Sequence, residues 1–279
     1  MKKKTILSFV LAVLTAGAGL VQADIVSIYV GVDSRTTPFN APGGSGPYPD
    51  NPNNGRLTLL YHHGDHFHGI GAYRYTGPAD TPVLEDTNGN NRLPESFTGL
   101  SPVRLAKGTG EFDGKYRSGL PSGLSQNTEY GNFELRNVHS LAGEDDTTYN
   151  SSAGRWNGEF ANSDVYLELI SATQGLNIVF GDMATMDLTA GNKYALGAGN
   201  AMFSVKPTFW LDGTAHAGMY TAEFRLVDMA DSMRNSGRFF VDVAVVPEPA
   251  GAGLALPGST MFAAALWRRR RDAQPVTEA

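Results

Sequence analysis

Short runs of alternating apolar and polar residues recur along the chain, and clusters of turn-forming residues separate them. In residues 218–228, Tyr220 and Phe224 fall on one side of an extended backbone, whereas Thr221 and Glu223 fall on the other. Since side chains alternate between the two faces of a strand, this pattern predicts a half-buried β-strand. Similar patterns predict strands at residues 24–33, 55–61, 164–170, 175–180 and 237–246.

The order of these segments predicts the fold class. No long amphipathic helix stands out between them. Many short strands joined by turns favour an all-β fold, and we expect an antiparallel β-sandwich that forms a single domain over residues 24–246. Residues 40–55, NAPGGSGPYPDNPNNG, hold too many prolines and glycines for a strand and are expected to form a surface loop.

The segment EDTNGNNRLPES (85–96) begins like a calcium-binding loop but departs from the full pattern. Asp86, Asn88 and Asn90 alternate as calcium ligands do. Asn91 stands where such a loop has glycine, and Phe97 follows where it has a bidentate glutamate. An Asx-rich turn is therefore the better interpretation.

Residues 1–23 have the pattern of a secretory signal peptide. Lysines at positions 2–4 precede an apolar run, which ends at the small-residue site VQA (21–23). This order predicts export and a mature chain that begins at Asp24. A membrane anchor is the alternative, but the run is short for a span and no stop-transfer pattern follows it.

Residues 247–271 combine three features in a fixed order. The tripeptide Pro-Glu-Pro (247–249) precedes a weakly apolar segment, and arginines follow at 268–271. A plain C-terminal membrane helix is the alternative, although the glycines and the proline of the segment lower helix propensity.

This order resembles the PEP-CTERM sorting signal of Gram-negative bacteria, in which an exosortase-type transpeptidase recognises the tripeptide. The resemblance implies a sorting helix that anchors the chain transiently in the membrane and is then removed with the polar tail (272–279). It implies a destination in the periplasm, at the outer surface or in the extracellular matrix.

The net charge and the lack of cysteine limit the classes of partner and of metal ligand that are expected for residues 24–246. The terminal segments hold seven of the 22 basic and three of the 28 acidic residues, so the domain between them carries a net charge near −10. An acidic domain repels nucleic acid and anionic lipid, and neither is expected as a partner. Cysteine is absent. Any transition-metal site must therefore use imidazole and carboxylate ligands, and no disulfide holds the core together.

The segment YHHGDHFHGIGAY (61–73) contains four of the six histidines of the chain. The dipeptide Gly-Asp (64–65) is a two-residue turn signal, which predicts a β-hairpin in which His63 faces His66. Side-chain alternation then places His68 on the same face. Opposed Cβ atoms lie about 4.5–5.5 Å apart, so two imidazoles can reach one zinc ion. The segment predicts a metal site, and a solvated hairpin tip with passive histidines is the alternative.

A closed zinc site requires a fourth protein ligand, whereas an open site leaves a position for water or a partner. The further candidates are His62, the turn residue Asp65, and His216, which precedes the predicted strand 218–228. His62 points to the opposite face unless the turn is wider. For His139, hydrogen bonding at a strand end is the preferred interpretation. Imidazole ligands suit Zn²⁺, and Cu²⁺ and Ni²⁺ stay open because imidazole binds them as well.

A second resemblance rests on segments spread over the mature chain. The histidine segment, NNRLPESF (90–97) and GRWNGEF (154–160) resemble a family of exported PEP-CTERM proteins associated with control by the zinc-uptake repressor. The segment TAHAGMYTAEF (214–224) is similar to a pattern in surface-anchored proteins that accompany metal-chelate transporters, although a second histidine often stands where this chain has Thr214.

The second resemblance implies that the protein binds, stores or hands over zinc outside the cytoplasm under zinc limitation. The positions it implicates are His62, His63, His66, His68 and His216.

Three functions compete. The first is a non-catalytic zinc-binding protein, with exopolysaccharide or envelope zinc-uptake components as further partners. The second is a zinc hydrolase. It is disfavoured because the H-E-x-x-H and G-x-S-x-G motifs are absent and Asp65 is the only acid in the cluster, so no catalytic residue is assigned. The third is a structural or carbohydrate-binding component of the extracellular matrix. Exposed aromatic residues such as Trp156 and Trp210 would serve it, although aromatics in a sandwich usually belong to the core.

Overall fold

A computed structural model describes residues 25–37, 48–119, 131–181 and 187–246. The predicted signal peptide (1–23), the sorting segment (247–271) and the polar tail (272–279) lie outside these residues. The described residues up to Val245 belong to one compact unit. Within the described ranges, no helix has both the length and the apolar character needed to cross a membrane.

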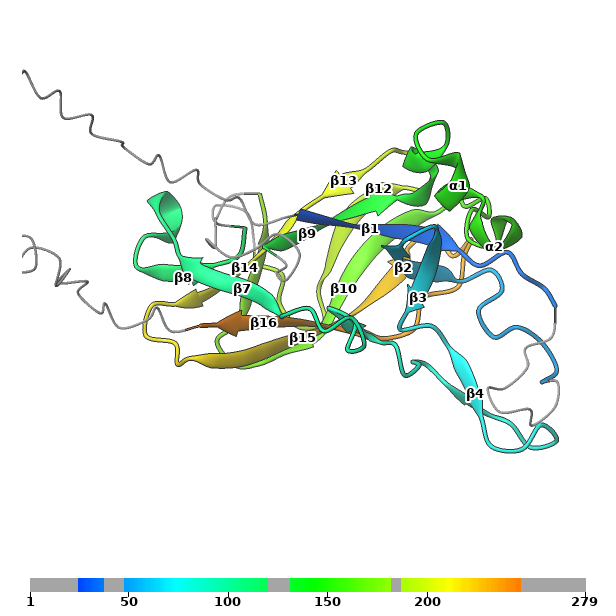
Figure 1. The fold of residues 1–279 in the computed structure, drawn as a ribbon, viewed down its shortest axis with the longest axis horizontal. Coiled ribbons are helices and arrows are strands. Elements are labelled where there is room, and N and C mark those ends of the chain that lie inside the picture. The colour runs from blue at the N-terminus through cyan, green and yellow to red at the C-terminus, as the bar shows by residue number, and fades with distance from the viewer. Residues whose placement is uncertain (1–24, 38–47, 120–130, 182–186, 247–279) are drawn as a thin grey trace, which may run out of the picture. The chain divides into compact units, whose positions relative to one another are not determined.

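Two sheets make up this unit (Figure 1). The smaller sheet has the order β13 (Ser204–Val205), β9 (Asn132–Asn137), β1 (Ile25–Val32), β2 (Leu57–His63) and β3 (His66–Ile70). The larger sheet has the order β11 (Asn177–Phe180), β14 (Pro207–Asp212), β8 (Lys115–Arg117), β7 (Val103–Lys107), β16 (Phe239–Val245), β15 (Gly218–Asp228), β10 (Asp164–Ala172) and β12 (Lys193–Ala198), and β6 (Arg92–Leu93) also pairs with β16.

Shorter elements lie between the strands of these two sheets. The strands β4 (Arg74–Thr76) and β5 (Val83–Glu85) form a separate ribbon, which projects from the sheets (Figure 1). Four short helical turns complete the described structure: η1 (Gly110–Phe112), η2 (Val138–Leu141), α1 (Asp146–Tyr149) and α2 (Ser151–Gly154).

The predicted all-β fold is confirmed. Each strand expected from the alternating pattern is present, with bounds within two residues of those predicted. Most neighbouring strands are antiparallel, as in the hairpins β2–β3 and β15–β16. The sheets are mixed, however, because β1 pairs with β9 in parallel and β16 pairs in parallel with both β6 and β7. These parallel partners are distant in sequence, so the alternation of a single strand carries no sign of them.

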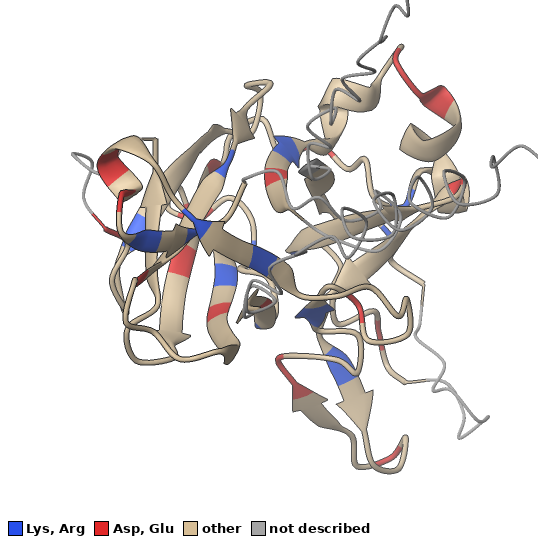
Figure 2. Cartoon of the chain, turned by 60° about the vertical axis from the view of Figure 1, so that its left-hand side comes forward, with Lys and Arg blue, Asp and Glu red and all other residues tan. Residues whose placement is uncertain are grey.

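The two sheets share one apolar core. Buried side chains of the smaller sheet, such as Ile28 and Leu59, belong to the same cluster as Phe224 and Val243 of the larger sheet. Basic and acidic residues are intermixed along the strands (Figure 2). Cross-strand ion pairs such as Arg225–Glu168 therefore offset charge locally.

In the described part of the expected surface loop, residues 48–55, Tyr48 and residues 51–53 are buried while residues 49–50 are exposed, so the expectation holds only in part. Amide side chains make this burial possible, because they replace the hydrogen bonds that water would supply. Asn51 donates to the Asp33 carboxylate at 3.1 Å. Asn53 exchanges two hydrogen bonds with the backbone of Tyr73, at 2.7 and 2.8 Å. The composition of this segment correctly predicted that residues 48–55 form no strand, but it did not predict the hydrogen bonds of Asn51 and Asn53.

The buried carboxylate of Asp33 is the electrostatic anchor of this region. Its side chain is 0% exposed and accepts hydrogen bonds from the Arg155 guanidinium at distances of 2.6 and 3.0 Å. Removing one partner of a buried pair leaves an uncompensated charge, which costs far more than the net contribution of the pair.

We therefore predict that Arg155→Met lowers the free energy of unfolding by about 3–5 kcal/mol, measured by urea denaturation. The matched control is Arg74→Met, which breaks the more exposed pair with Glu85. This control should cost less than about 1 kcal/mol. Equal losses in the two variants would contradict an anchoring role for Asp33.

Candidate metal centre

The hairpin β2–β3 carries the histidine cluster, and its register is the one predicted from the turn. His63 pairs with His66, and Tyr61 pairs with His68. Gly64 has a φ of +65°, a conformation that glycine adopts without steric cost. The tight turn fixes the register, and the register decides which histidines share a face.

The two faces of this hairpin meet different surroundings. On one face His62 lies 3.0 Å from the hydroxyl of Thr148 in α1, and its neighbour Phe67 is buried against Tyr29. On the other face His68 contacts Glu95, which follows β6 and so comes from the side of the larger sheet. His63, His66 and His68 therefore lie at the rim of the face that packs on the larger sheet.

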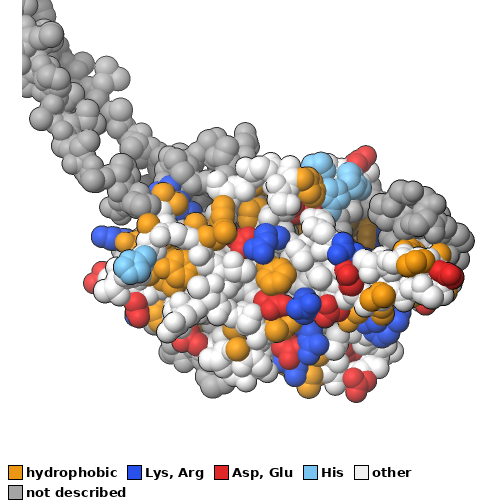
Figure 3. All heavy atoms as spheres, turned by 90° about the horizontal axis from the view of Figure 1, so that it is seen from below, with side chains coloured by type: hydrophobic (Ala, Val, Ile, Leu, Met, Phe, Trp, Pro, Cys, Tyr) orange, Lys and Arg blue, Asp and Glu red, His pale blue; other side chains and the backbone are white. Residues whose placement is uncertain are grey.

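The three histidines converge. Each offers one ring nitrogen, and these nitrogens all lie within 4.8 Å of one another. The Nε2 atoms of His66 and His68 are 3.0 Å apart. Two nitrogens bound to one tetrahedral zinc at 2.0–2.1 Å would be separated by about 3.3 Å, so only a small adjustment is needed. Histidine side chains gather in a patch on the surface in Figure 3.

Carboxylates hold the outer nitrogens of two of these rings. The Nδ1 of His66 lies 3.0 Å from Asp65, and the Nδ1 of His68 lies 3.1 Å from Glu95. A carboxylate accepts hydrogen bonds, so both Nδ1 atoms carry protons and both Nε2 lone pairs are directed inward. The bond from His66 also lowers the pKa of Asp65. A carboxylate that orients a histidine in this way is typical of metal centres.

The facing Nε2 atoms of His66 and His68 require a proton or a metal ion between them. Two lone pairs 3.0 Å apart repel each other unless a proton or a metal ion lies between them. Without a metal, a proton on one of the two Nε2 atoms meets this requirement by hydrogen bonding to the other. A metal ion that takes this place must displace that proton.

Glu95 is the better fixed of the two carboxylates. Its side chain is fully buried, whereas that of Asp65 is 86% exposed. Asn90 donates a hydrogen bond to the same Glu95 oxygen that His68 approaches. The predicted Asx-rich turn thus helps to position Glu95. The ring of Phe97 lies 5.3 Å from the ring of His68 and covers the edge of the cluster.

The other predicted ligands lie elsewhere. His62 points to the opposite face, where its Nε2 also approaches the carbonyl of Gly64 at 2.8 Å. His216 is exposed in the connection between β14 and β15, and its donor atoms are not among those that converge. His139 follows β9, where its ring stacks on Phe160 and its Nδ1 lies 2.9 Å from the Tyr149 hydroxyl.

The location of His216 follows from the register of the larger sheet. Gly218 pairs with Val245 at one end of the β15–β16 ladder, and the backbone of Gly71, just after β3, approaches Arg238 at the other end. The seven residues of β16 span about 20 Å. His216 therefore belongs to the end of the larger sheet that is remote from the segment after β3.

The geometry establishes that His63, His66 and His68 form a cluster that could hold a metal ion. No protein-family model matches the chain. No curated protein matches it either. Among solved structures, an inclusion body protein, PixA, from Burkholderia cenocepacia is similar over 81% of this chain and 97% of its own, with 13% identity and a TM-score of 0.15. A likeness this weak carries no argument about fold or function.

Sequence reasoning missed Glu95 and Phe97. Both lie in the segment NNRLPESF, which carries part of the family resemblance but lacks a ligand pattern of its own. Glu95 is separated from His68 by 27 positions, so no local spacing could link them. A lone glutamate that becomes fully buried is recognisable only from the packing of the two sheets.

The proposed aromatic platforms for carbohydrate binding are not available on the surface. Trp156 is 5% exposed and Trp210 is 8% exposed, so both belong to the core. Stacking of a sugar needs an accessible ring face. The structure thus excludes these two rings as platforms for a sugar.

We predict that Glu95→Gln weakens binding of a metal ion at the cluster about 10- to 100-fold, because a neutral acceptor leaves His68 less basic and less firmly oriented. Isothermal titration calorimetry measures the change. Glu85→Gln, at an exposed pair in β5, is the control and should bind as the native protein does. Circular dichroism establishes that both variants are folded. Equal affinity of Glu95→Gln and native protein would show that Glu95 is only a packing residue.

Proposed function

We propose that the protein is a non-catalytic zinc-binding protein that binds, stores or hands over zinc outside the cytoplasm under zinc limitation. His63, His66 and His68 supply the ligands, and Asp65 and Glu95 orient two of them. The observation that carries the proposal is the pair of facing Nε2 atoms, 3.0 Å apart, whose outer nitrogens both meet carboxylates.

A passive hairpin tip would not require this arrangement. Exposed histidines without a role gain little from a buried carboxylate, whereas burying Glu95 costs desolvation that only strong hydrogen bonds offset. The site also lies in an acidic domain, which favours cations. Three imidazoles leave a fourth position open for water or a ligand from a partner, and this position suits transfer of the ion.

The assignment to binding without catalysis rests on the roles of the two carboxylates. A zinc hydrolase usually needs a carboxylate that acts as a base on the metal-bound water. Asp65 and Glu95 are instead hydrogen-bonded to the outer nitrogens of His66 and His68. The cellular context in the proposal, with export and exosortase-type processing, comes from the sequence of the two termini.

Zinc titration of the metal-free domain (24–246) tests the ligands. We expect one-to-one binding by calorimetry that disappears when His63, His66 and His68 are all replaced by alanine. His216→Ala is the matched control, since it removes an exposed histidine outside the cluster and should leave the affinity unchanged. Absence of binding by the folded native domain would overturn the proposal. Competition with Cu²⁺ and Ni²⁺ in the same experiment establishes the preference.

Zinc binding should release a proton and weaken as the pH falls through about 6.5, where free histidine takes up a proton. Calorimetry in buffers with different ionisation enthalpies counts the protons released. At a pH below about 6.5, a heat of binding that is independent of the buffer would contradict competition between zinc and protons for the ring nitrogens.

A further inference from the structure

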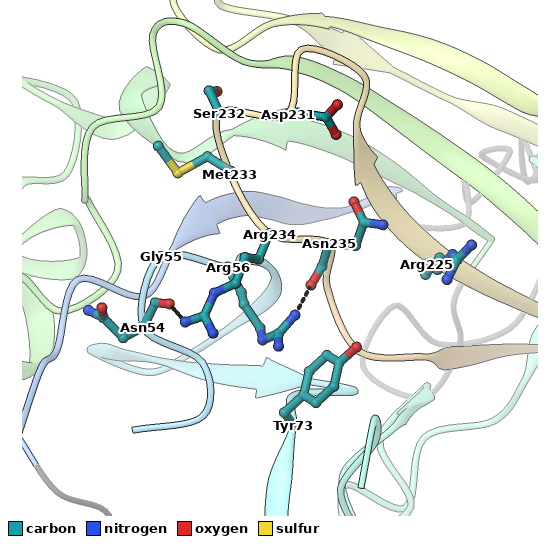
Figure 4. Close-up of a pocket in the computed structure, with 10 residues that line it drawn as sticks. All are labelled: Asn54, Gly55, Arg56, Tyr73, Arg225, Asp231, Ser232, Met233, Arg234 and Asn235. Carbon is teal, nitrogen blue, oxygen red and sulfur yellow. Dashed lines mark hydrogen bonds between the residues drawn. The ribbon is translucent and has the colours of Figure 1, made fainter. Parts of the chain in front are cut away.

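A second polar site lies at the other end of the hairpin from the histidines. A pocket of about 680 Å³ opens between the residues that lead into β2, Tyr73 after β3, and the connection from β15 to β16. Its walls include Arg56, Arg234 and Asn235 (Figure 4). Since β2 spans about 20 Å from Leu57 to His63, this pocket is separate from the metal centre.

The two guanidinium groups lie next to each other in the pocket (Figure 4). That of Arg56 packs 3.8 Å above the ring of Tyr73. Burial lowers the pKa of Arg56, and the nearby charge of Arg234 acts in the same direction. Two neighbouring guanidinium cations repel each other, so their proximity costs free energy unless an anion offsets it.

Among the described residues, the hydrogen-bond acceptors of these guanidinium groups are backbone carbonyl groups. Arg56 donates to the carbonyls of Pro52 and Asn235, at 2.8 and 3.1 Å. Arg234 donates to the carbonyl of Asn54. Each guanidinium carries five N–H groups, so several donors remain free toward the pocket.

This pair differs from most arginines of the described structure, which have carboxylate partners. Examples are the pairs Arg92–Asp242, Arg155–Asp33 and Arg238–Asp86. Within the described ranges, neither Arg56 nor Arg234 makes such a pair. A domain with an excess of acidic residues thus holds two adjacent cations without a carboxylate of its own.

We propose that this pocket binds a carboxylate group of a small hydroxylated acid, with uronic acids as the chemical class. Arg56 and Arg234 would hold the carboxylate, since a planar guanidinium donates two parallel hydrogen bonds to it. Asp231 also lines the pocket, and its carboxylate lies away from the two guanidinium groups (Figure 4). It accepts hydrogen bonds from hydroxyl groups and repels a second negative charge, so the pocket favours a monoanion over phosphate.

The test uses the purified protein, stripped of metal and dialysed free of chelator, so that the histidine cluster does not contribute. Glucuronate is titrated at constant ionic strength and followed by the shifts of backbone amide NMR signals. We expect saturable shifts in residues 54–56 and 231–235. Arg234→Gln should weaken binding at least about tenfold, because it removes a charged donor from an exposed side chain.

Lys107→Gln is the matched control, since it removes one positive charge from an exposed residue that does not line the pocket. It should leave glucuronate binding unchanged. Failure of glucuronate to saturate, or equal loss of binding in the two variants, would overturn the proposal. Tighter binding of inorganic phosphate than of glucuronate would overturn the assignment to a carboxylate.

Discussion

The two-residue turn at Gly64 and Asp65 is the constraint on which the metal centre depends. It sets the hairpin register, and a shift of one residue would exchange the two faces of β3. His66 and His68 would then point toward the helices, and Phe67 would leave the core. The burial of Phe67 and the convergence of the histidines therefore rest on the same backbone geometry. The core stabilises the register, and the register assembles the ligands.

The centre is built from both sheets. The smaller sheet supplies the three histidines, while Glu95 reaches His68 from the segment that follows β6 on the larger sheet. The segment that precedes β6 is fixed by further contacts. Thr87 donates to the carbonyl of Arg238, and Asn91 donates to Thr87. A disturbance of the packing between the sheets would thus move the carboxylate relative to the ring that it orients.

The sequence was sufficient for the local features and insufficient for the long-range ones. Alternation predicted the strands, and the Gly-Asp turn predicted that His63 would face His66, because both signals lie within a few residues. Glu95, the parallel pairing of β1 with β9 and the burial of Asn51 all depend on contacts between distant segments. The position of His216 could not be predicted from its sequence neighbours for the same reason. Its segment resembles a ligand pattern, but the order of strands decides which end of the sheet it occupies.

The absence of cysteine gives the position of Glu95 a wider consequence. Because the chain contains no cysteine, no disulfide can join the two sheets, and the contact between His68 and Glu95 crosses the boundary between them. An ion bound to His68 would strengthen the contact by adding its binding free energy to that of the folded state. At the proposed location outside the cytoplasm, the lifetime of the protein among proteases would then depend on its metal content. Metal-free molecules would be degraded sooner than metal-bound ones, and no further factor would be needed to distinguish the two forms.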